Sequence, residues 1–332
     1  MKRPKGRCLL EEEECIHVMS RVVQKRFLID ERGMEEMRRI LRTQADFAGL
    51  DVITFCFLRN HFHILLHIDP ERAREGVTDA ELVRRFRALY GTKRSPSLGV
   101  DAKGLAVLLE QNKPRADEVR GKLRARMGDV SVFMRELKTR FTFWYNKHYK
   151  TVGTFWAERF RSVLVEPGSG ALRTVAAYID LNAVRAELAE SPEQYRYCGL
   201  GEALGGRATA KAAYRWLTRR RQGRGEWEWA NRDVFGEYVA HVRRLTIAFQ
   251  TEKAARNRAR DSAEEGMQGV VEEDPPINGY GAKGGAVGSA SWVERLCEAG
   301  GRMGFLRKRR PIALDGPTGE SLYAARRWRQ RG

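Results

Sequence analysis

The sequence has little of what would form disulfides, a zinc site or a membrane span. Its five cysteines are widely separated and none forms a Cys-x-x-Cys pair, so neither a disulfide framework nor a zinc ribbon is expected. No apolar run approaches the roughly 18 residues of a membrane span. Glu11 to Glu14 stand where a signal peptide would need apolar residues. We therefore expect a cytoplasmic protein with reduced thiols.

Positive charge, in contrast, is abundant. The chain has 332 residues, 61 of them Lys or Arg against 43 Asp or Glu, which gives a net charge of +18. Residues 1–200 hold 36 basic against 27 acidic residues, and residues 201–332 hold 25 against 16, so the shorter part is the more densely basic. Such a surface attracts polyanions, and nucleic acid is the first candidate. A ribosomal or chromatin-like scaffold would carry the same excess.

The hydrophobic pattern of the first 200 residues predicts strands and helices in a definite order. Strand-like patterns cover 15–23, 51–58, 61–68 and 159–166. Helical spacing covers 31–48, 79–90, 131–148 and 171–187. The order strand–helix–strand–strand–helix–strand predicts an α+β fold: a ferredoxin-like split βαβ antiparallel sheet with helices on one side.

Changes in composition predict how the chain is divided into domains. Residues 1–200 form one domain, with a Gly-, Lys- and Arg-rich insertion at about 92–128. Residues 201–260 predict a basic helical extension. Residues 261–290 read as an acidic and then Gly-rich linker, and 291–332 as a basic C-terminal segment. The whole extension is expected to be mainly helical and partly disordered.

Two histidines on the strand predicted over 61–68 are candidate metal ligands. His61 and His63 are two residues apart, so they point to the same face of a strand. Two adjacent imidazoles can hold one divalent cation. With six histidines in the chain, a His-x-His spacing also arises by chance, so the motif alone leaves the question open. His17 and His67 are further candidates, with His67 read as a strand-end residue.

A tyrosine and an asparagine share one face of the helix predicted over 171–187. Tyr178 and Asn182 are four residues apart, and Arg185 follows close to the same face. A tyrosine is a weak nucleophile that needs activation. Taken alone, this segment is better explained as an ordinary helix with a half-buried tyrosine.

In combination, these segments resemble the HUH-type single-tyrosine transposases, and the REP-associated tyrosine transposases are the most similar branch. The resemblance covers roughly residues 15–200. It rests on segments in the family's order: Ile16 to Arg21, Arg59 to Leu66, Leu137 to Phe141, Trp156 to Ser162, Tyr178 to Arg185 and Pro192 to Tyr195. Arg59 and Ala183 each replace a proline common in the family, and neither change removes a functional group.

The resemblance implies a metal-dependent endonuclease and strand transferase for single-stranded DNA at hairpin-flanked sites, acting in DNA transposition. His61 and His63 would bind Mg²⁺ or Mn²⁺, and Asn182 would be the third ligand. Tyr178 would be the nucleophile that forms a 5′-phosphotyrosine. The implied partner is single-stranded or hairpin DNA, with no membrane. The protein would be a monomer or homodimer, cytoplasmic and nucleoid-associated.

Basic residues are candidate DNA contacts because they neutralise phosphates. The candidates are Arg21, Arg140, Arg159, Arg161, Arg185, Arg307, Lys308, Arg309 and Arg310. Phe143 and Trp144, on the helix predicted over 131–148, offer either a stacking platform for bases or core packing. We expect core packing for both.

Other functions share parts of this pattern. One is a catalytically silent hairpin-binding DNA protein, which the intact His61, His63, Tyr178 and Asn182 disfavour. A second is a replication initiator or relaxase with the same histidine pair, whose motif order usually differs. A third is a metallohydrolase unrelated to DNA, for which the charge of +18 would be accidental.

Overall fold

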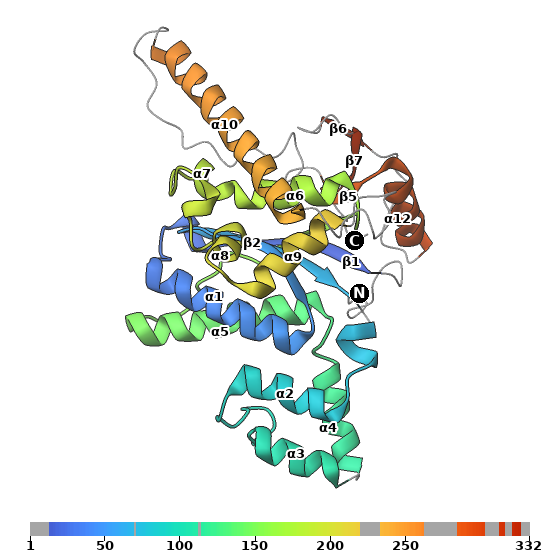
Figure 1. The fold of residues 1–332 in the computed structure, drawn as a ribbon. Helices are drawn as coiled ribbons and strands as arrows, with labels where there is room; N and C mark the ends of the chain where they lie inside the picture. Colours follow the sequence, from blue (N-terminus) through green and yellow to red (C-terminus); the bar gives the residue numbers. More distant parts are fainter. Residues whose placement is uncertain are drawn as a thin grey trace. The chain divides into compact units, whose positions relative to one another are not determined.

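A computed structural model of the chain describes residues 13–69, 71–111, 114–219, 233–261, 284–302, 312–315 and 321–326. Its contacts divide the chain into two compact units. Unit 1 comprises Met1–Val52 and Arg59–Ser162, and unit 2 comprises Ile53–Leu58 and Val163–Gly332. Both units mix helices with strands (Figure 1), so the protein is of the mixed α/β kind. The domain limits expected from composition remain a prediction.

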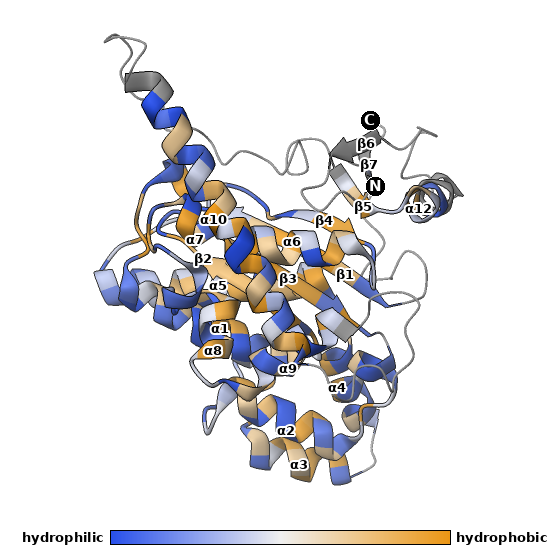
Figure 2. Cartoon of the chain, turned by 45° about the horizontal axis from the view of Figure 1, so that its top comes forward, coloured by the Kyte–Doolittle hydropathy of each residue, from blue (hydrophilic) through white to orange (hydrophobic). Residues whose placement is uncertain are grey.

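The strands of unit 1 form an antiparallel ladder. β1 (Glu14–Arg21) pairs with β3 (His61–Ile68), with Met19 opposite His63 and Arg21 opposite His61. Every residue of β3 is buried, and the strand is largely hydrophobic in Figure 2. Burial on both faces holds the ladder in one register, because a slip by one residue would exchange the two faces.

Two long helices of unit 1 confirm the helical spacing read from the sequence. α1 (Glu31–Ala48) begins at Asp30, whose side chain accepts a hydrogen bond from the Gly33 N–H, and ends at Gly49 with φ of 67°. α5 (Val130–Tyr149) begins at Asp129, which caps it in the same way. The two helices pack against each other.

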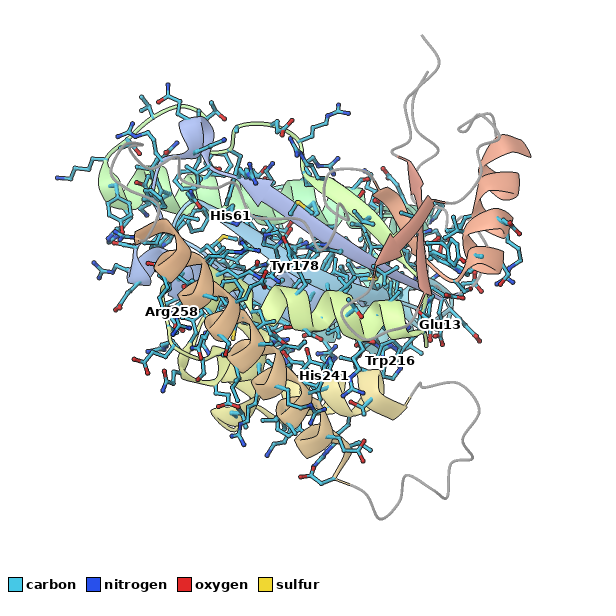
Figure 3. The ribbon with its side chains drawn as sticks, turned by 90° about the horizontal axis from the view of Figure 1, so that it is seen from above. Glu13, His61, Tyr178, Trp216, His241 and Arg258 are labelled. Atoms are coloured by element: carbon cyan, nitrogen blue, oxygen red, sulfur yellow. The ribbon has the colours of Figure 1, made fainter. Side chains whose placement is uncertain are left out.

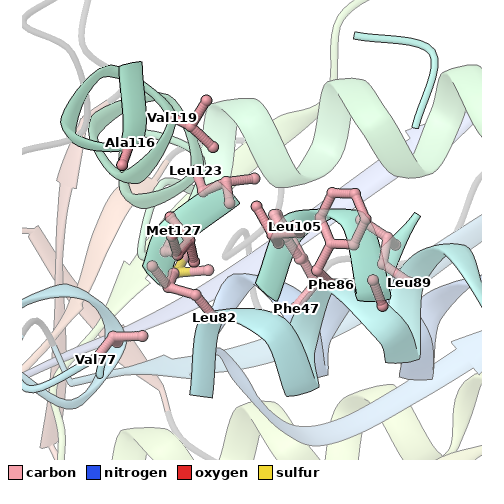
Figure 4. Packing of buried hydrophobic residues seen from close by; sticks show 12 residues of the cluster. Phe47, Val77, Leu82, Phe86, Leu89, Leu105, Ala116, Val119, Leu123 and Met127 are labelled. Carbon is pink, nitrogen blue, oxygen red and sulfur yellow. The ribbon is translucent and has the colours of Figure 1, made fainter. Parts of the chain in front are cut away.

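The insertion predicted at 92–128 is an ordered group of helices. α3 (Ala102–Glu110) and α4 (Pro114–Arg124) lie beside α2 (Asp79–Tyr90), as Figure 1 shows. Twelve buried side chains from these helices and their surroundings, including Phe47 of α1, form a hydrophobic core of their own (Figure 4). Its charged composition concealed this core, because the buried residues are spread thinly through a basic segment.

Helices dominate the first part of unit 2. β2 (Asp51–Phe57) contributes its residues from Ile53 onward. The helical segments that follow along the chain are α6 (Gly170–Asp180), α7 (Asn182–Arg185), η3 (Pro192–Gln194), α8 (Gly199–Leu204), α9 (Ala208–Arg219) and α10 (Val234–Asp261). The single helix predicted over 171–187 is thus two helices. Leu181 between them keeps a right-handed helical backbone.

The end of the chain adds strands that were not predicted. β5 (Gly284–Gly288) runs parallel to β4 (Arg161–Val165) and antiparallel to β7 (Ser321–Arg326), which pairs in turn with β6 (Ile312–Asp315). α12 (Ala290–Arg302) lies between β5 and β6 in sequence. Residues 284–288 of the predicted linker are therefore a strand, because β4 and β7, both distant in the sequence, supply its hydrogen bonds. Within the described ranges, no helix combines the length and apolarity that crossing a bilayer needs.

Candidate active site

The two histidines of the His-x-His motif lie side by side on β3. Their ring centroids are 5.2 Å apart and their planes meet at 79°. His61 is 9% exposed and His63 is 3% exposed. Alternation along the strand thus brings both rings to one face, as the sequence predicts, and burial limits their movement.

Each ring makes a hydrogen bond through its Nδ1 atom. His61 Nδ1 is 2.6 Å from Oδ1 of Asn60, and Asn60 Nδ2 donates to the Lys25 carbonyl at 3.3 Å. His63 Nδ1 is 2.9 Å from Nε2 of His17, which is fully buried in β1. Burial lowers the pKa of His17 to about 3, so its imidazole is neutral at neutral pH.

A small pocket opens beside the two histidines and collects positive charge. Besides His61 and His63 it is lined by Met19, Ser20, Arg21, Glu158, Arg159 and Arg161. Arg161 pairs with Glu158 at 3.1 Å. Three of the arginines expected to contact DNA therefore surround the histidine pair. Guanidinium groups bind phosphate well because their donors match its oxygens.

Other candidates of unit 1 lie away from this pocket. The guanidinium of Arg140 is 5.2 Å from the centre of the Tyr90 ring, and desolvation lowers its pKa. Phe143 is 72% exposed, so the prediction that it packs in the core is wrong. It lies on the outward face of α5, one position from the partly buried Trp144, which stacks on His148. Arg140 thus stabilises the contact with α2, and Phe143 remains accessible.

Tyr178 and Asn182 lie in unit 2, on α6 and α7 (Figure 3 labels Tyr178). The guanidinium of Arg185 is 4.7 Å from the centre of the Tyr178 ring, so the spacing of seven residues brings them face to face. Asn182 is 1% exposed, and neither atom of its amide has a hydrogen-bond partner among the described residues. A buried amide without partners costs free energy, which a ligand can recover.

The sequence did not reveal a buried carboxylate between these two residues. Asp180 accepts hydrogen bonds from the hydroxyls of Thr54 at 2.6 Å, Tyr214 at 2.9 Å and Tyr238 at 2.6 Å. Burial raises its pKa to about 6, against the opposing effect of these hydroxyls. The donors come from β2, α9 and α10. An aspartate on an otherwise apolar helix face was the only signal of this cluster.

Two further residues prove to be structural. Tyr195, at the end of a segment that carries the family resemblance, donates its hydroxyl to the Phe57 carbonyl at 2.8 Å in a buried site. His67 lies between Asp51 and Glu13, at 3.2 Å and 3.3 Å. His67 therefore stabilises the end of its strand, as the sequence predicts. The candidate DNA contacts from Arg307 to Arg310 lie outside the described residues.

The histidine pair of unit 1 fits a divalent cation in the orientation of the His61 ring. The Asn60 amide is oriented by Lys25, so its oxygen accepts from His61 and leaves the lone pair of that ring on Nε2. The described residues contain no group of three His, Cys, Asp or Glu that could hold a metal.

No family model and no curated protein matches this chain. Among solved structures, a similar one carries the description "Structure of the REP associates tyrosine transposase bound to a REP hairpin". The match covers 63% of this chain and 87% of that chain, at 13% identity and a TM-score of 0.36. The likeness is distant, and by itself it shows neither the fold nor the activity of this chain.

Proposed function

We propose that this protein is a transposase-like enzyme that cuts and rejoins single-stranded DNA at hairpin-flanked sites. The observation that carries the proposal is the pocket of unit 1, where His61 and His63 lie among Arg21, Arg159 and Arg161. A histidine pair on a neutral surface would fit many metalloenzymes. Three arginines around the pair fit a phosphate-bearing substrate instead.

The proposal assigns a role to each group of residues. His61 and His63 hold Mg²⁺ or Mn²⁺, and Asn182 supplies a third ligand on the strength of the sequence resemblance. The bound cation would withdraw charge from the scissile phosphate. Arg21, Arg159 and Arg161 hold the DNA backbone. The guanidinium of Arg185 beside Tyr178 stabilises negative charge on the attacking oxygen.

The reaction exchanges one phosphodiester bond for another. The Tyr178 oxygen attacks the phosphorus and loses its proton to solvent. The bond from phosphorus to the 3′ oxygen breaks, and that oxygen takes up a proton to become a free 3′-OH. The DNA remains attached as a 5′-phosphotyrosine ester. A second 3′-OH then attacks this ester and releases the tyrosine, so strands are joined without an added energy source.

The proposal includes the finer fold that such an enzyme needs. The observed order of strands and α-helices up to α6 is strand, helix, strand, strand, four helices from α2 to α5, strand and helix. This order supports a ferredoxin-like arrangement of β1, β2, β3 and β4. The alternative of a catalytically silent hairpin-binding protein keeps the same fold and loses only the chemistry.

The test is a search for the covalent intermediate. The full chain is incubated with Mn²⁺ and a labelled single-stranded oligonucleotide that contains a hairpin, and products are separated on a denaturing gel. We expect a slow-migrating adduct that is absent with EDTA and absent in Tyr178→Phe. Tyr195→Phe is the matched control, because its hydroxyl is bound to a carbonyl, and it should keep the adduct.

The other outcomes identify the alternatives. Tight binding of the hairpin without any adduct would mean a binding protein rather than an enzyme. An adduct that persists in Tyr178→Phe and disappears in another tyrosine variant would place the nucleophile elsewhere. An adduct formed in the presence of EDTA would refute the metal dependence.

A further inference from the structure

The histidine pair depends on which ring nitrogen carries the proton. A neutral imidazole has one N–H and one lone pair, and only the nitrogen with the lone pair can bind a cation. Both rings make a hydrogen bond at Nδ1. If Nδ1 is the donor in each case, the lone pair is on Nε2 in both rings. The partner at Nδ1 therefore decides whether the pair can bind metal.

For His61 the neighbouring contacts decide the direction. Asn60 Nδ2 donates to the Lys25 carbonyl at 3.3 Å, which leaves Asn60 Oδ1 as the acceptor facing His61 at 2.6 Å. His61 must then donate from Nδ1. Both ends of the Asn60 amide are thus hydrogen-bonded. This arrangement fixes the tautomer of His61, with the proton on Nδ1 and the lone pair on Nε2.

For His63 the partner is a second imidazole on the neighbouring strand. In the β1–β3 ladder Met19 is opposite His63, and His17 is two residues from Met19 on the same face. His17 is therefore the diagonal neighbour of His63. Its Nε2 is 2.9 Å from His63 Nδ1, and the two rings are stacked with centroids 5.1 Å apart. Full burial keeps His17 in place.

We propose that His17 is a positioning residue whose Nε2 accepts the Nδ1 proton of His63, so that His63 presents its Nε2 lone pair to a cation. Asn60 has the same role for His61. The inference rests on the proposed function for its purpose, because a tautomer matters only if the pair binds metal. The opposite direction, with His17 as donor, would leave the proton on Nε2 of His63 and block it as a ligand.

This arrangement matches the way in which metal-binding histidines are generally held. Such a ring usually donates its other N–H to an acceptor, which fixes its tautomer and orientation. Loss of such an acceptor typically lowers metal affinity by about 10-fold to 100-fold. The acceptors here differ, since one is an amide on a turn and the other is an imidazole on a strand.

The experiment measures the tautomers directly and the affinity separately. Ring ¹⁵N chemical shifts of the metal-free full chain distinguish protonated from unprotonated nitrogens, and the six histidines can be assigned by single substitutions. Mn²⁺ affinity is measured by electron paramagnetic resonance on the same samples. The variants are His17→Phe, which removes the acceptor and keeps an aromatic ring, and His17→Gln, which restores an acceptor. His67→Phe, on the same strand as the pair, is the control.

We expect an unprotonated Nε2 at His61 and His63 in the wild type. His17→Phe should lose this signature at His63 only and bind Mn²⁺ about 10-fold to 100-fold more weakly. His17→Gln should recover most of the affinity, which a purely structural role would not predict. His67→Phe should bind as the wild type does.

The failure of the inference differs from the failure of the proposed function. A protonated Nε2 at His63 in the wild type, or unchanged tautomer and affinity in His17→Phe, overturns the role of His17 and leaves the metal site standing. A wild type that binds no Mn²⁺ overturns the proposed chemistry, and the ¹⁵N shifts then still decide which ring donates. If His17→Phe does not fold, the wild-type spectrum and His17→Gln decide the question.

Discussion

Each unit contains one buried polar cluster, and the two clusters differ in whether their contacts lead to a pocket. The histidine cluster of unit 1 consists of His17, His61 and His63, and its chain of contacts ends at a pocket lined by arginines. The carboxylate cluster of unit 2 consists of Asp180 and the hydroxyls of Thr54, Tyr214 and Tyr238. Its members also contact each other, since the hydroxyl oxygens of Tyr214 and Thr54 are 2.8 Å apart.

The difference separates a cluster that opens on a pocket from one whose hydroxyl groups all contact a carboxylate within the cluster. Burial shifts the pKa of His17 down and that of Asp180 up, because in both cases it penalises the charged form. In the carboxylate cluster, three hydroxyl donors partly compensate the buried charge. In the histidine cluster, the rings are ordered toward a pocket. Polar burial alone does not indicate function; the direction in which the donors and acceptors point does.

The largest expected effect tests the stability side of this comparison. Asp180→Ala removes the common acceptor of three buried hydroxyls, and each unsatisfied group costs about 1–3 kcal/mol. We expect the free energy of unfolding to fall by about 3 kcal/mol or more. Urea denaturation followed by circular dichroism measures it. His17→Phe leaves a single N–H without its acceptor and should cost less. An equal or larger loss in His17→Phe would break the comparison.

The next effect is the pH dependence of stability, in which the clusters have opposite signs. The pKa of Asp180 is raised from its usual 3.8 to about 6, so its contribution to stability is full below about pH 4 and is lost as pH rises through 6. This amounts to about 3 kcal/mol. The pKa of His17 is lowered from its usual 6.5 to about 3, so its contribution is present above about pH 6.5 and is lost as pH falls.

Unfolding free energies at pH 7 and at about pH 4.5 separate the two contributions. Asp180→Asn should lose more stability on acidification than the wild type. In the wild type, protonation of the Asp180 carboxyl stabilises the folded state as pH falls, and the variant has no such group. His17→Phe should lose less. Parallel pH profiles for wild type and Asp180→Asn would show that the carboxyl is not held in its unusual state.

The smallest expected effect tests whether the pocket beside the histidine cluster contributes to DNA binding. Arg159→Ala removes one cation from the rim of the histidine pocket. We expect binding of a hairpin oligonucleotide to weaken several-fold, and the slope of log affinity against log salt to become shallower by about one. Fluorescence anisotropy at four salt concentrations measures both. Arg87→Ala, an exposed residue on α2, is the control. Identical slopes for both variants would remove Arg159 from the binding surface.

Much of unit 1 follows from local sequence signals. Asp30 and Gly49 mark the ends of α1, and alternation along β3 brings His61 and His63 together. Near-neighbour patterns are sufficient there because the elements begin and end with strong caps or turns. The same reasoning failed for Phe143, since the helical period places a residue on a face but does not say whether another element covers that face.

The unpredicted parts depend on partners far away in the chain. β5 was read as linker because three of the five residues from Gly284 to Gly288 are glycines, yet backbone pairing requires no side chain. Gly288 lies so close to Trp292 that a Cβ would be 2.6 Å from its ring. The acceptor role of His17 and the hydroxyls around Asp180 were invisible for the same reason. His17 and His63 are 46 positions apart in the sequence, and Thr54 and Asp180 are 126 positions apart.

The two tyrosines that reach Asp180 from α9 and α10 have an evolutionary consequence. A descendant that lost the chain beyond residue 200 would keep Asp180 but lose Tyr214 and Tyr238, leaving Thr54 as the one remaining hydroxyl of the cluster. Such a descendant would be under selection to replace the aspartate with an uncharged residue. The identity of residue 180 and the length of the chain are therefore expected to be inherited together.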